Sequence, residues 1–336
     1  MSDTPERSMA AKGTGARMPR DVIDSLERLA LPIVWVVTIA IFGAVRPDTF
    51  LTWSNFSTIL GSQAVLVVVA LGLIIPLTAG DYDLSIASVV TLSSMIVAVL
   101  NVNHGLPIGW AILGALATGA MTGIVNGFFV LYFRINSLIV TLGVGTFLHG
   151  VTLWISDSQT ISGISDWLVT VVIVTRLFGV PLGFYYALLL CIAIWYVFSY
   201  TALGRRLVFV GRGREVARLS GIRVDRVRWG CFIVSGLMGA FAGIVYSGTT
   251  GAADPSSGLS FLLPAFAAAF LGATSINPGR FNPWGTMISV YFLVTGITGL
   301  SILGVSTFVQ DLFYGGALVI AVTLSQLVRG REERLA

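Results

Sequence analysis

Long apolar segments constrain this chain more than any other feature of its sequence. Ten of them follow one another between residues 29 and 328. A helix that crosses a bilayer needs about 20 mostly apolar residues. Of the 336 residues, 55% are apolar and only 11% are charged, whereas an ordinary soluble domain is about a quarter charged. These features exclude a water-soluble monomer and predict an all-α polytopic membrane protein with about ten transmembrane helices.

The predicted spans form one transmembrane domain with two short ends. We expect a cytoplasmic N-terminal segment at 1–28, which does not resemble a cleavable signal peptide. The transmembrane domain covers 29–328 and a cytoplasmic tail covers 329–336. The longest polar connection within the domain is 201–228. The spans are 29–45, 56–79, 84–102, 108–133, 137–155, 182–200, 229–251, 259–274, 284–300 and 308–328.

The basic residues predict the orientation of these spans. With the N-terminus in the cytoplasm, ten spans return the C-terminus to the same side. All but two of the 20 lysines and arginines then lie inside, and only Arg46 and Arg176 lie outside. This asymmetry is what the positive-inside rule requires, and the opposite orientation would reverse it. We therefore expect both termini in the cytoplasm.

Two apolar stretches depart from a regular span. The segment 259–274 is short and contains Pro264, and the additional apolar run 169–174 is too short to cross a bilayer. Irregular backbone at membrane depth occurs where it is buried in protein or lines a cavity. The sequence therefore predicts some discontinuous helices, and a re-entrant or interfacial piece at 169–174.

The chain lacks the residues that hydrolysis of a nucleotide requires. A Walker loop needs a lysine that reaches the phosphates and a hydroxyl that holds magnesium, but the only lysine, Lys12, lies outside any such pattern. His104 and His149 belong to no catalytic or metal motif, and Cys191 and Cys231 lie inside apolar runs. We expect no enzyme activity, metal site or cofactor in this chain, so ATP and Mg²⁺ would be bound by a partner.

Two carboxylates interrupt the apolar sequence at residues 78–88. A charged group at membrane depth costs several kcal/mol, so it usually faces a cavity or a partner. One interpretation is that Asp83 and Ser85 cap the next helix, where they satisfy free amides and favour the helix dipole. The other is that Asp81, Asp83 and Ser85 lie on a transport pathway at a broken helix pair. The two interpretations are compatible.

A second interruption lies at residues 272–286, where prolines and glycines break apolar sequence on the predicted cytoplasmic side. It contains Thr274, Ser275 and Arg280. Such a break is typical of discontinuous helices at transport pathways. It is also typical of a tight connection in which Arg280 anchors the topology. The sequence leaves both interpretations open.

The connection 201–228 holds eight arginines. Within it, residues 214–220 predict two helical turns with Val216 and Leu219 on one face, ended by Gly221. A short surface helix of this kind could dock into a groove on a soluble partner. The alternative is a solvated basic loop that serves only the topology. Nucleic-acid binding is not expected, because no aromatic side chains interleave the arginines.

At these three stretches the sequence resembles the permease subunits of bacterial ATP-binding cassette importers for monosaccharides, of the ribose, xylose and galactose type. The resemblance covers about residues 50–328. It lies in the pattern G-G-x-D-L-S-x-G-S at 80–88, the pattern A-x-L-S-G-I at 217–222, the pattern G-x-T-S-x-x-x-G-R-x-x-x-W-G-T at 272–286, and in Asn126-Gly127, Arg134-Ile135, Ile139 to Gly143 and Leu303 to Ser306.

The resemblance implies a multi-pass permease of the bacterial inner membrane that pairs with a second copy or a paralogue. A cytoplasmic ATPase subunit would supply ATP hydrolysis, and a periplasmic sugar-binding protein would deliver the sugar. The implied substrate-pathway residues are Asp81, Asp83, Ser85, Asn126, Thr274 and Ser275. The implied coupling segment that seats in the ATPase is Glu215, Val216, Ala217, Arg218, Leu219, Ser220, Gly221 and Ile222.

The sequence also departs from the family pattern. Asp81 replaces the usual second glycine, and Ala87 replaces a later glycine. An added carboxylate near the pathway could favour polyols or amino sugars, or could pair with Arg280 on the same predicted side. The alternative to the importer is a secondary transporter driven by an ion gradient, in which Asp81 and Asp83 serve as proton or sodium sites.

Overall fold

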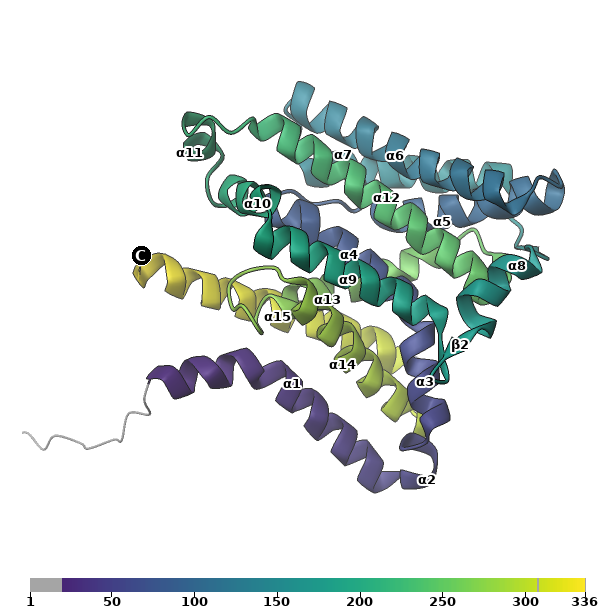
Figure 1. Ribbon diagram of the computed structural model, residues 1–336, viewed down its shortest axis with the longest axis horizontal. Helices are drawn as coiled ribbons and strands as arrows, with labels where there is room; N and C mark the ends of the chain where they lie inside the picture. Colours follow the sequence, from purple (N-terminus) through teal and green to yellow (C-terminus); the bar gives the residue numbers. More distant parts are fainter. Residues whose placement is uncertain (1–19, 307, 336) are drawn as a thin grey trace, which may run out of the picture.

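The structure, a computed structural model, describes residues 20–306 and 308–335. These residues form an almost entirely helical protein (Figure 1). The helices are α1 (Arg20–Val45), α2 (Pro47–Phe50), α3 (Trp53–Ser62), α4 (Ala64–Thr78), α5 (Ile86–Ala98), α6 (Ile108–Tyr132), α7 (Ser137–Ile155), α8 (Asp166–Val169), α9 (Leu182–Tyr200), α10 (Ala202–Arg212), α11 (Arg214–Leu219), α12 (Val224–Thr250), α13 (Leu262–Gly272), α14 (Pro283–Ile302) and α15 (Phe308–Leu335).

Short irregular elements connect these helices. Two π-helical turns, η1 (Val99–Asn103) and η2 (Thr170–Val174), extend α5 and α8, and a 3-10 turn, η3 (Ser257–Phe261), precedes α13. Four two-residue strands form two antiparallel pairs. The strand β1 (Ile161–Ser162) pairs with β4 (Ala252–Ala253), and β2 (Arg176–Leu177) pairs with β3 (Val180–Pro181).

Every predicted span is helical in the structure. Among the described residues, seven helices are long and apolar enough to cross a membrane, or eight if α3 and α4, which bend by 42° at Gln63, form one span. The remaining two predicted spans are the shorter apolar helices Leu29–Val45 and Ser257–Gly272. The prediction of an all-α polytopic membrane protein is therefore confirmed.

The predicted terminal segments are only partly covered by the structure. Residues 1–19 of the N-terminal segment lie outside the described residues, and α1 begins at Arg20. At the other end, α15 continues through the predicted tail to Leu335.

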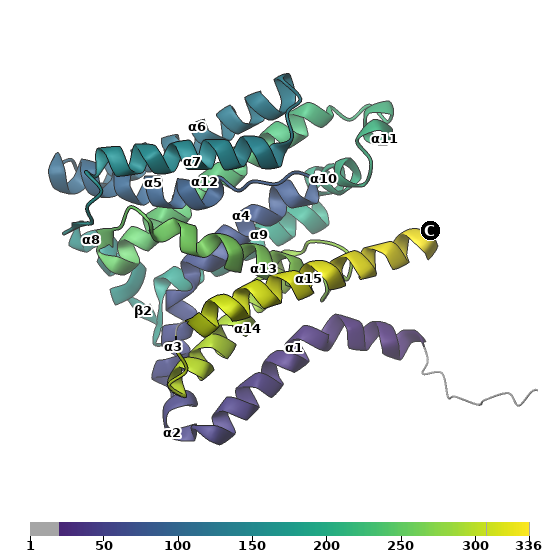
Figure 2. The same cartoon turned by 180° about the vertical axis from the view of Figure 1, so that it is seen from behind.

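The helices pack around α4. Residues 64–77 of α4 are all buried, as expected for a helix that is apolar on every side. In Figures 1 and 2, α5, α6, α7 and α12 lie on one side of α4, whereas α13, α14 and α15 lie on the other and α1 lies at the edge. α12 contacts α4, α5 and α6. Gly236 allows its close approach to α6, because a Cβ there would overlap the carbonyl oxygen of Gly119.

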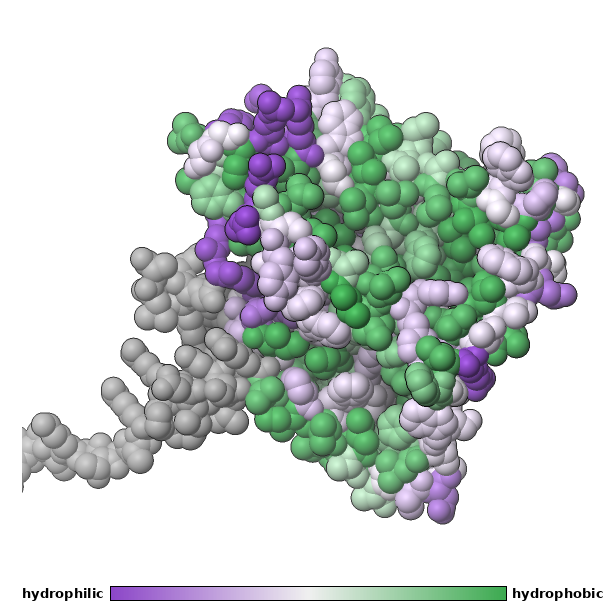
Figure 3. Space-filling model, in the orientation of Figure 1, coloured by the Kyte–Doolittle hydropathy of each residue, from purple (hydrophilic) through white to green (hydrophobic). Residues whose placement is uncertain are grey.

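The molecule has two polar ends. At one end lie α10, α11, the start of α1 and the end of α15 (left in Figure 1), and α8 and β2 lie at the other. Hydrophilic residues gather over the α10–α11 end (Figure 3). The apolar run 169–174 forms η2, which is too short to span, as predicted. Its Val172 is buried and contacts Gly248 of α12 at the end opposite to α11.

The connection 201–228 is more structured than the sequence indicates. Its predicted helix is confirmed as α11, and Gly221, with a φ of 79°, lies directly after the turn that ends it. The sequence does not predict α10, which Thr201 caps by accepting a hydrogen bond from the Gly204 amide. α10 buries Leu207 and Val210 against the bundle. The connection therefore holds two helices at the arginine-rich end.

Candidate functional site

The break between α4 and α5 is a short extended segment held by α7. α4 ends at Thr78, and Gly80 reverses the chain with a φ of 78°, a conformation that glycine adopts without strain. The amide of Tyr82 then donates to Ser137 Oγ at 3.1 Å, and the amide of Leu84 donates to Thr141 Oγ1 at 3.0 Å. The two hydroxyls replace the helical hydrogen bonds that the break removes.

Asp83 is the centre of a buried hydrogen-bond network. Its Oδ1 accepts from the amide of Ser85 at 3.0 Å and from the Ser85 hydroxyl at 2.6 Å. Its Oδ2 accepts from the hydroxyl of Ser235 on α12 at 2.7 Å. Asn126 of α6 donates to Ser85 Oγ at 2.8 Å. All four residues are buried. Through these hydrogen bonds, the network links the start of α5 to α6 and α12 at the break.

Two parts of this arrangement bear on the sequence predictions. The Ser85 amide and hydroxyl both donate to Asp83 Oδ1 just before α5, but the Ser85 side chain itself forms no capping hydrogen bond with that helix. The predicted residues Asp83, Ser85 and Asn126 are in direct contact, but the sequence did not indicate Ser235. It is one of several serines within apolar spans, and only its packing opposite Asp83 distinguishes it.

Asp81 lies at the same break and carries two ion pairs. The guanidinium of Arg228 on α12 binds it with two hydrogen bonds, from Nε to Oδ2 at 2.6 Å and from Nη2 to Oδ1 at 2.7 Å. The guanidinium of Arg214 at the start of α11 binds Oδ1 at 3.0 Å. Asp81 is 1% exposed, and a buried carboxylate requires such partners.

The hypothesis that Asp81 pairs with Arg280 is therefore wrong. Arg280 is exposed in the connection between α13 and α14 and forms no ion pair among the described residues. The sequence placed both residues on one side of the membrane. It did not show that α11 and α12 bring two other arginines into direct contact with the carboxylate.

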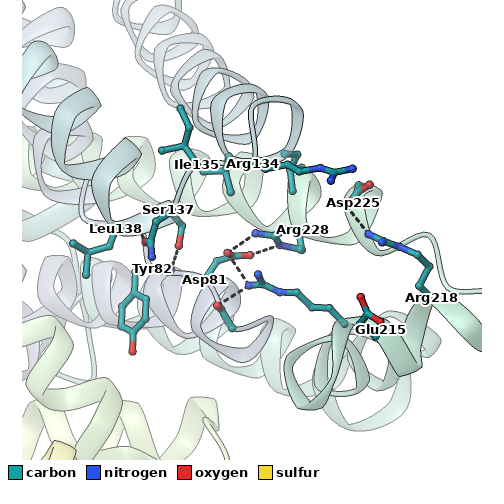
Figure 4. A pocket seen from close by; sticks show the side chains of 15 residues that line it. Asp81, Tyr82, Arg134, Ile135, Ser137, Leu138, Glu215, Arg218, Asp225 and Arg228 are labelled. Atoms are coloured by element: carbon teal, nitrogen blue, oxygen red, sulfur yellow. Dashed lines mark hydrogen bonds and ion pairs between the residues drawn. The ribbon is translucent and has the colours of Figure 1, made fainter.

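A charged pocket opens beside this ion-pair cluster (Figure 4). It has a volume of about 520 Å³. Of the six predicted pathway residues, only Asp81 lines it. Its walls come from the α4–α5 break, the end of α6, the start of α7, α11 and the start of α12: Gly80, Asp81, Tyr82, Val130, Leu131, Arg134, Ile135, Asn136, Ser137, Leu138, Arg214, Glu215, Arg218, Asp225 and Arg228.

Thr274 and Ser275 lie in a separate connection, between α13 and α14. Thr274 donates its hydroxyl proton to the carbonyl of Leu271 at 2.7 Å. Asn282 caps α14 by accepting from the Gly285 amide at 2.6 Å, and it donates to the carbonyls of Gly272 and Ser275. Asn282 thus holds this break together.

α11 presents an exposed face at the end of the molecule. Ala217 is buried against the neighbouring helices. Leu219 is 88% exposed and Val216 is 58% exposed, although both are apolar. Glu215 and Arg218 are exposed beside them. Apolar side chains surrounded by charges on an exposed helix are typical of a surface that contacts another protein. Within the described part of the chain, no group of three or more His, Cys, Asp or Glu residues could hold a metal ion.

Comparison with known proteins identifies the relatives of this chain. The family model described as the permease component of branched-chain amino acid transport systems matches residues 55–322. The chain is 30% identical to the D-allose transport system permease protein of Escherichia coli K12, over 88% of this chain and 90% of that protein. It is 31% identical to the ribose import permease protein of Bacillus subtilis 168, over 88% and 92%.

A third relative is similar over almost the full length of both proteins. The chain is 29% identical to the L-arabinose ABC transporter permease protein of Azospirillum brasilense, over 99% of this chain and 96% of that protein. No solved structure matches. The region that the family model matches includes both helix breaks, the charged pocket and α11.

Proposed function

Because the chain belongs to the family of permease components of branched-chain amino acid transport systems, we propose that it is the membrane subunit of an ATP-driven importer for a monosaccharide or a similar polyhydroxylated solute. Relatives named for D-allose, ribose, L-arabinose and xylose support a sugar as the substrate. The resemblance drawn from the motifs is thereby confirmed.

We further propose ten crossings of the bacterial inner membrane, with both termini in the cytoplasm. Each predicted span is helical, and the start of α1 and the end of α15 lie at the same end of the molecule as α11 (Figure 1). The same end carries the arginines of the 201–228 connection. A basic end of this kind faces the cytoplasm.

The exposed face of α11 is the observation that carries the proposal of an ATPase partner. An isolated helix of six residues is not stable in water, and α11 is held by Ala217 on one side while Leu219 is exposed on the other. We propose that Glu215 to Ile222 seats in a cytoplasmic ATPase, which binds ATP and Mg²⁺. A periplasmic sugar-binding protein and a second permease copy or paralogue complete the importer.

For the pathway, we propose that the two helix breaks act as its moving parts. Asp83, Ser85 and Asn126 shape the first break, and Thr274 and Ser275 lie in the second. Both breaks consist of hydrogen-bonded loops, and loops of this kind absorb a change in backbone angles more readily than continuous helices do. Selectivity then comes mostly from the binding protein, because a pathway that bound sugar tightly would hinder its release.

Gentle purification from native membranes tests this proposal. We expect an ATPase with a Walker motif to copurify with the wild-type protein, identified by mass spectrometry. Leu219→Arg should abolish ATPase copurification and sugar uptake while the protein still inserts in the membrane, because it adds a charge to the apolar contact. Phe178→Arg is a matched control, since Phe178 is 84% exposed in the turn between β2 and β3, far from α11.

Two results would contradict the proposal. Undiminished uptake by Leu219→Arg would remove α11 from the coupling mechanism. Purification without an ATPase, together with uptake in liposomes driven by an ion gradient alone, would establish the secondary transporter instead.

A further inference from the structure

Asp81 is fixed rigidly to the end of α4. Its amide donates to the carbonyl of Pro76 at 2.9 Å, and it follows Gly80 in the reversal that ends the helix. The family pattern described above has a glycine at this position, so the carboxylate departs from that pattern. Both of its oxygens accept hydrogen bonds from guanidinium groups, so its charge is balanced by two arginines of the same chain.

Arg228 provides the stationary side of this contact. It binds Asp81 through two parallel hydrogen bonds, the strongest geometry between these side chains, and its side chain is only 12% exposed. Arg228 lies in the first turns of α12, which packs along α4, α5 and α6. This pair therefore ties the end of α4 to the start of α12 (Figure 4).

Arg214 provides the movable side. It is the first residue of α11, and its Nη2 donates both to Asp81 Oδ1 at 3.0 Å and to the carbonyl of Gly80 at 2.8 Å. Its side chain is 42% exposed. Gly211, in the last turn of α10, lies directly against the end of α4, because a Cβ there would overlap the carbonyl oxygen of Thr78. The start of α11 is thus in direct contact with the α4–α5 break.

α11 is exposed along one face, while buried Ala217 and an ion pair of Arg218 with Asp225 of α12 hold it to the bundle. Leu219, at its other end, is 88% exposed. A force applied there reaches Asp81 through one short helix and one side chain. From Asp81, two residues of backbone lead to Asp83 and its buried network with Ser85. The charged pocket beside the contact leaves space on the α11 side.

We propose that the contact of Arg214 with Gly80 and Asp81, anchored by Arg228, transmits movement of α11 to the α4–α5 break. This inference rests on the proposed function, since it needs an ATPase that moves α11. Asp81 and Arg214 are positioning residues, which act through the break and do not touch the solute.

A reporter at the break tests the inference without knowledge of the sugar. Tyr82 is partly exposed between Asp81 and Asp83. Tyr82→Cys, in a chain with both native cysteines replaced by alanine, is purified with its ATPase. Maleimide labelling of this cysteine is then measured with and without ATP and Mg²⁺. We expect ATP to change the labelling rate by about fivefold or more, the low end of common coupling energies.

Arg214→Gln should reduce this ATP-dependent change to less than about twofold, while ATP hydrolysis by the complex continues. Arg214→Lys should restore part of it, because the ammonium still reaches the carboxylate. Arg212→Gln is the matched control. Arg212 is an exposed arginine two residues away with no ion pair among the described residues, so its variant should respond to ATP as the wild type does.

The outcomes separate the two proposals. A full ATP response in Arg214→Gln overturns this inference and leaves the importer intact. Equal loss in Arg214→Gln and Arg212→Gln also overturns it, because the effect would then belong to the charge of the segment. Purification without an ATPase overturns the proposed function, and this inference with it.

Discussion

The Ser235 hydroxyl on α12 donates a hydrogen bond to the buried Asp83 carboxylate. Ser235→Ala removes the hydroxyl that donates to Asp83 Oδ2 at 2.7 Å. Because a buried oxygen left without a partner costs about 1–3 kcal/mol, we expect Ser235→Ala to lower the free energy of unfolding by about that amount. The measurement is thermal unfolding of the detergent-solubilised protein, followed by fluorescence-detected size exclusion.

Ser289→Ala is the control for this prediction. Ser289 is equally buried, but its hydroxyl donates to the Gly285 carbonyl in its own helix. Removal of this hydroxyl therefore leaves no charged group without a hydrogen-bond donor. We expect a much smaller decrease in thermal stability. Equal decreases in the two variants would show that Asp83 does not depend on Ser235.

At single residues, the sequence predicted the polar groups better than their partners. The Asp83–Ser85 contact spans two positions, so the chain itself forces it. The ion pairs of Asp81 join residues 133 and 147 positions apart. Which of the many arginines pair with Asp81 depends on how α11 and α12 pack. Neither the charges of the sequence nor the spacing of its residues predicts this packing. This is why Arg280 was the wrong partner.

The helices of the 201–228 connection illustrate the same limit at the scale of elements. α11 was predictable because Gly221 ends it and its apolar residues are spaced as on one helical face. α10 was missed because Arg205, Arg206 and Arg212 give it the composition of a loop. Its buried residues, Gly204, Leu207 and Val210, form a narrow face that packs against α9, α11 and α4.

The α13–α14 break gives a prediction for an element junction. Asn282 caps α14 and also holds the carbonyls of Gly272 and Ser275. Loss of an N-cap alone costs about 0.5–2 kcal/mol, and the two carbonyls lose a donor in addition. We therefore expect Asn282→Ala to lower thermal stability and to make the 272–286 connection more sensitive to proteases.

Asn277→Ala is the appropriate comparison, because Asn277 is exposed in the same connection and its side chain has no recorded hydrogen bond. Proteolysis at 272–286 should be unchanged in this variant. If Asn282→Ala resisted proteolysis as well as Asn277→Ala does, Asn282 would not be the residue that holds the break.

For the whole molecule, apolar segments predicted which stretches are helical better than the course of those helices. All ten predicted segments are helical, because a bilayer demands that backbone groups bond within each segment. The 42° bend between α3 and α4 was not predicted. Two polar residues, Ser62 and Gln63, interrupt segment 56–79 at the bend, but hydropathy does not give its angle. α3 packs against α9 and β3, whereas α4 is buried in the core.

The orientation of the whole molecule gives the last prediction. The native cysteines are buried within the bundle, so they should react poorly with a bulky maleimide. A single cysteine introduced at either end of the molecule therefore reports the side of the membrane on which that end lies. Arg176→Cys lies in the exposed β2 strand, and Arg212→Cys lies at the exposed end of α10.

We expect a membrane-impermeant maleimide to label Arg176→Cys in intact spheroplasts. Arg212→Cys should react only after permeabilisation, because the basic end faces the cytoplasm. The reverse pattern would place α11 outside, where no ATPase could reach it, and the coupling role of Leu219 and Arg214 would be untenable.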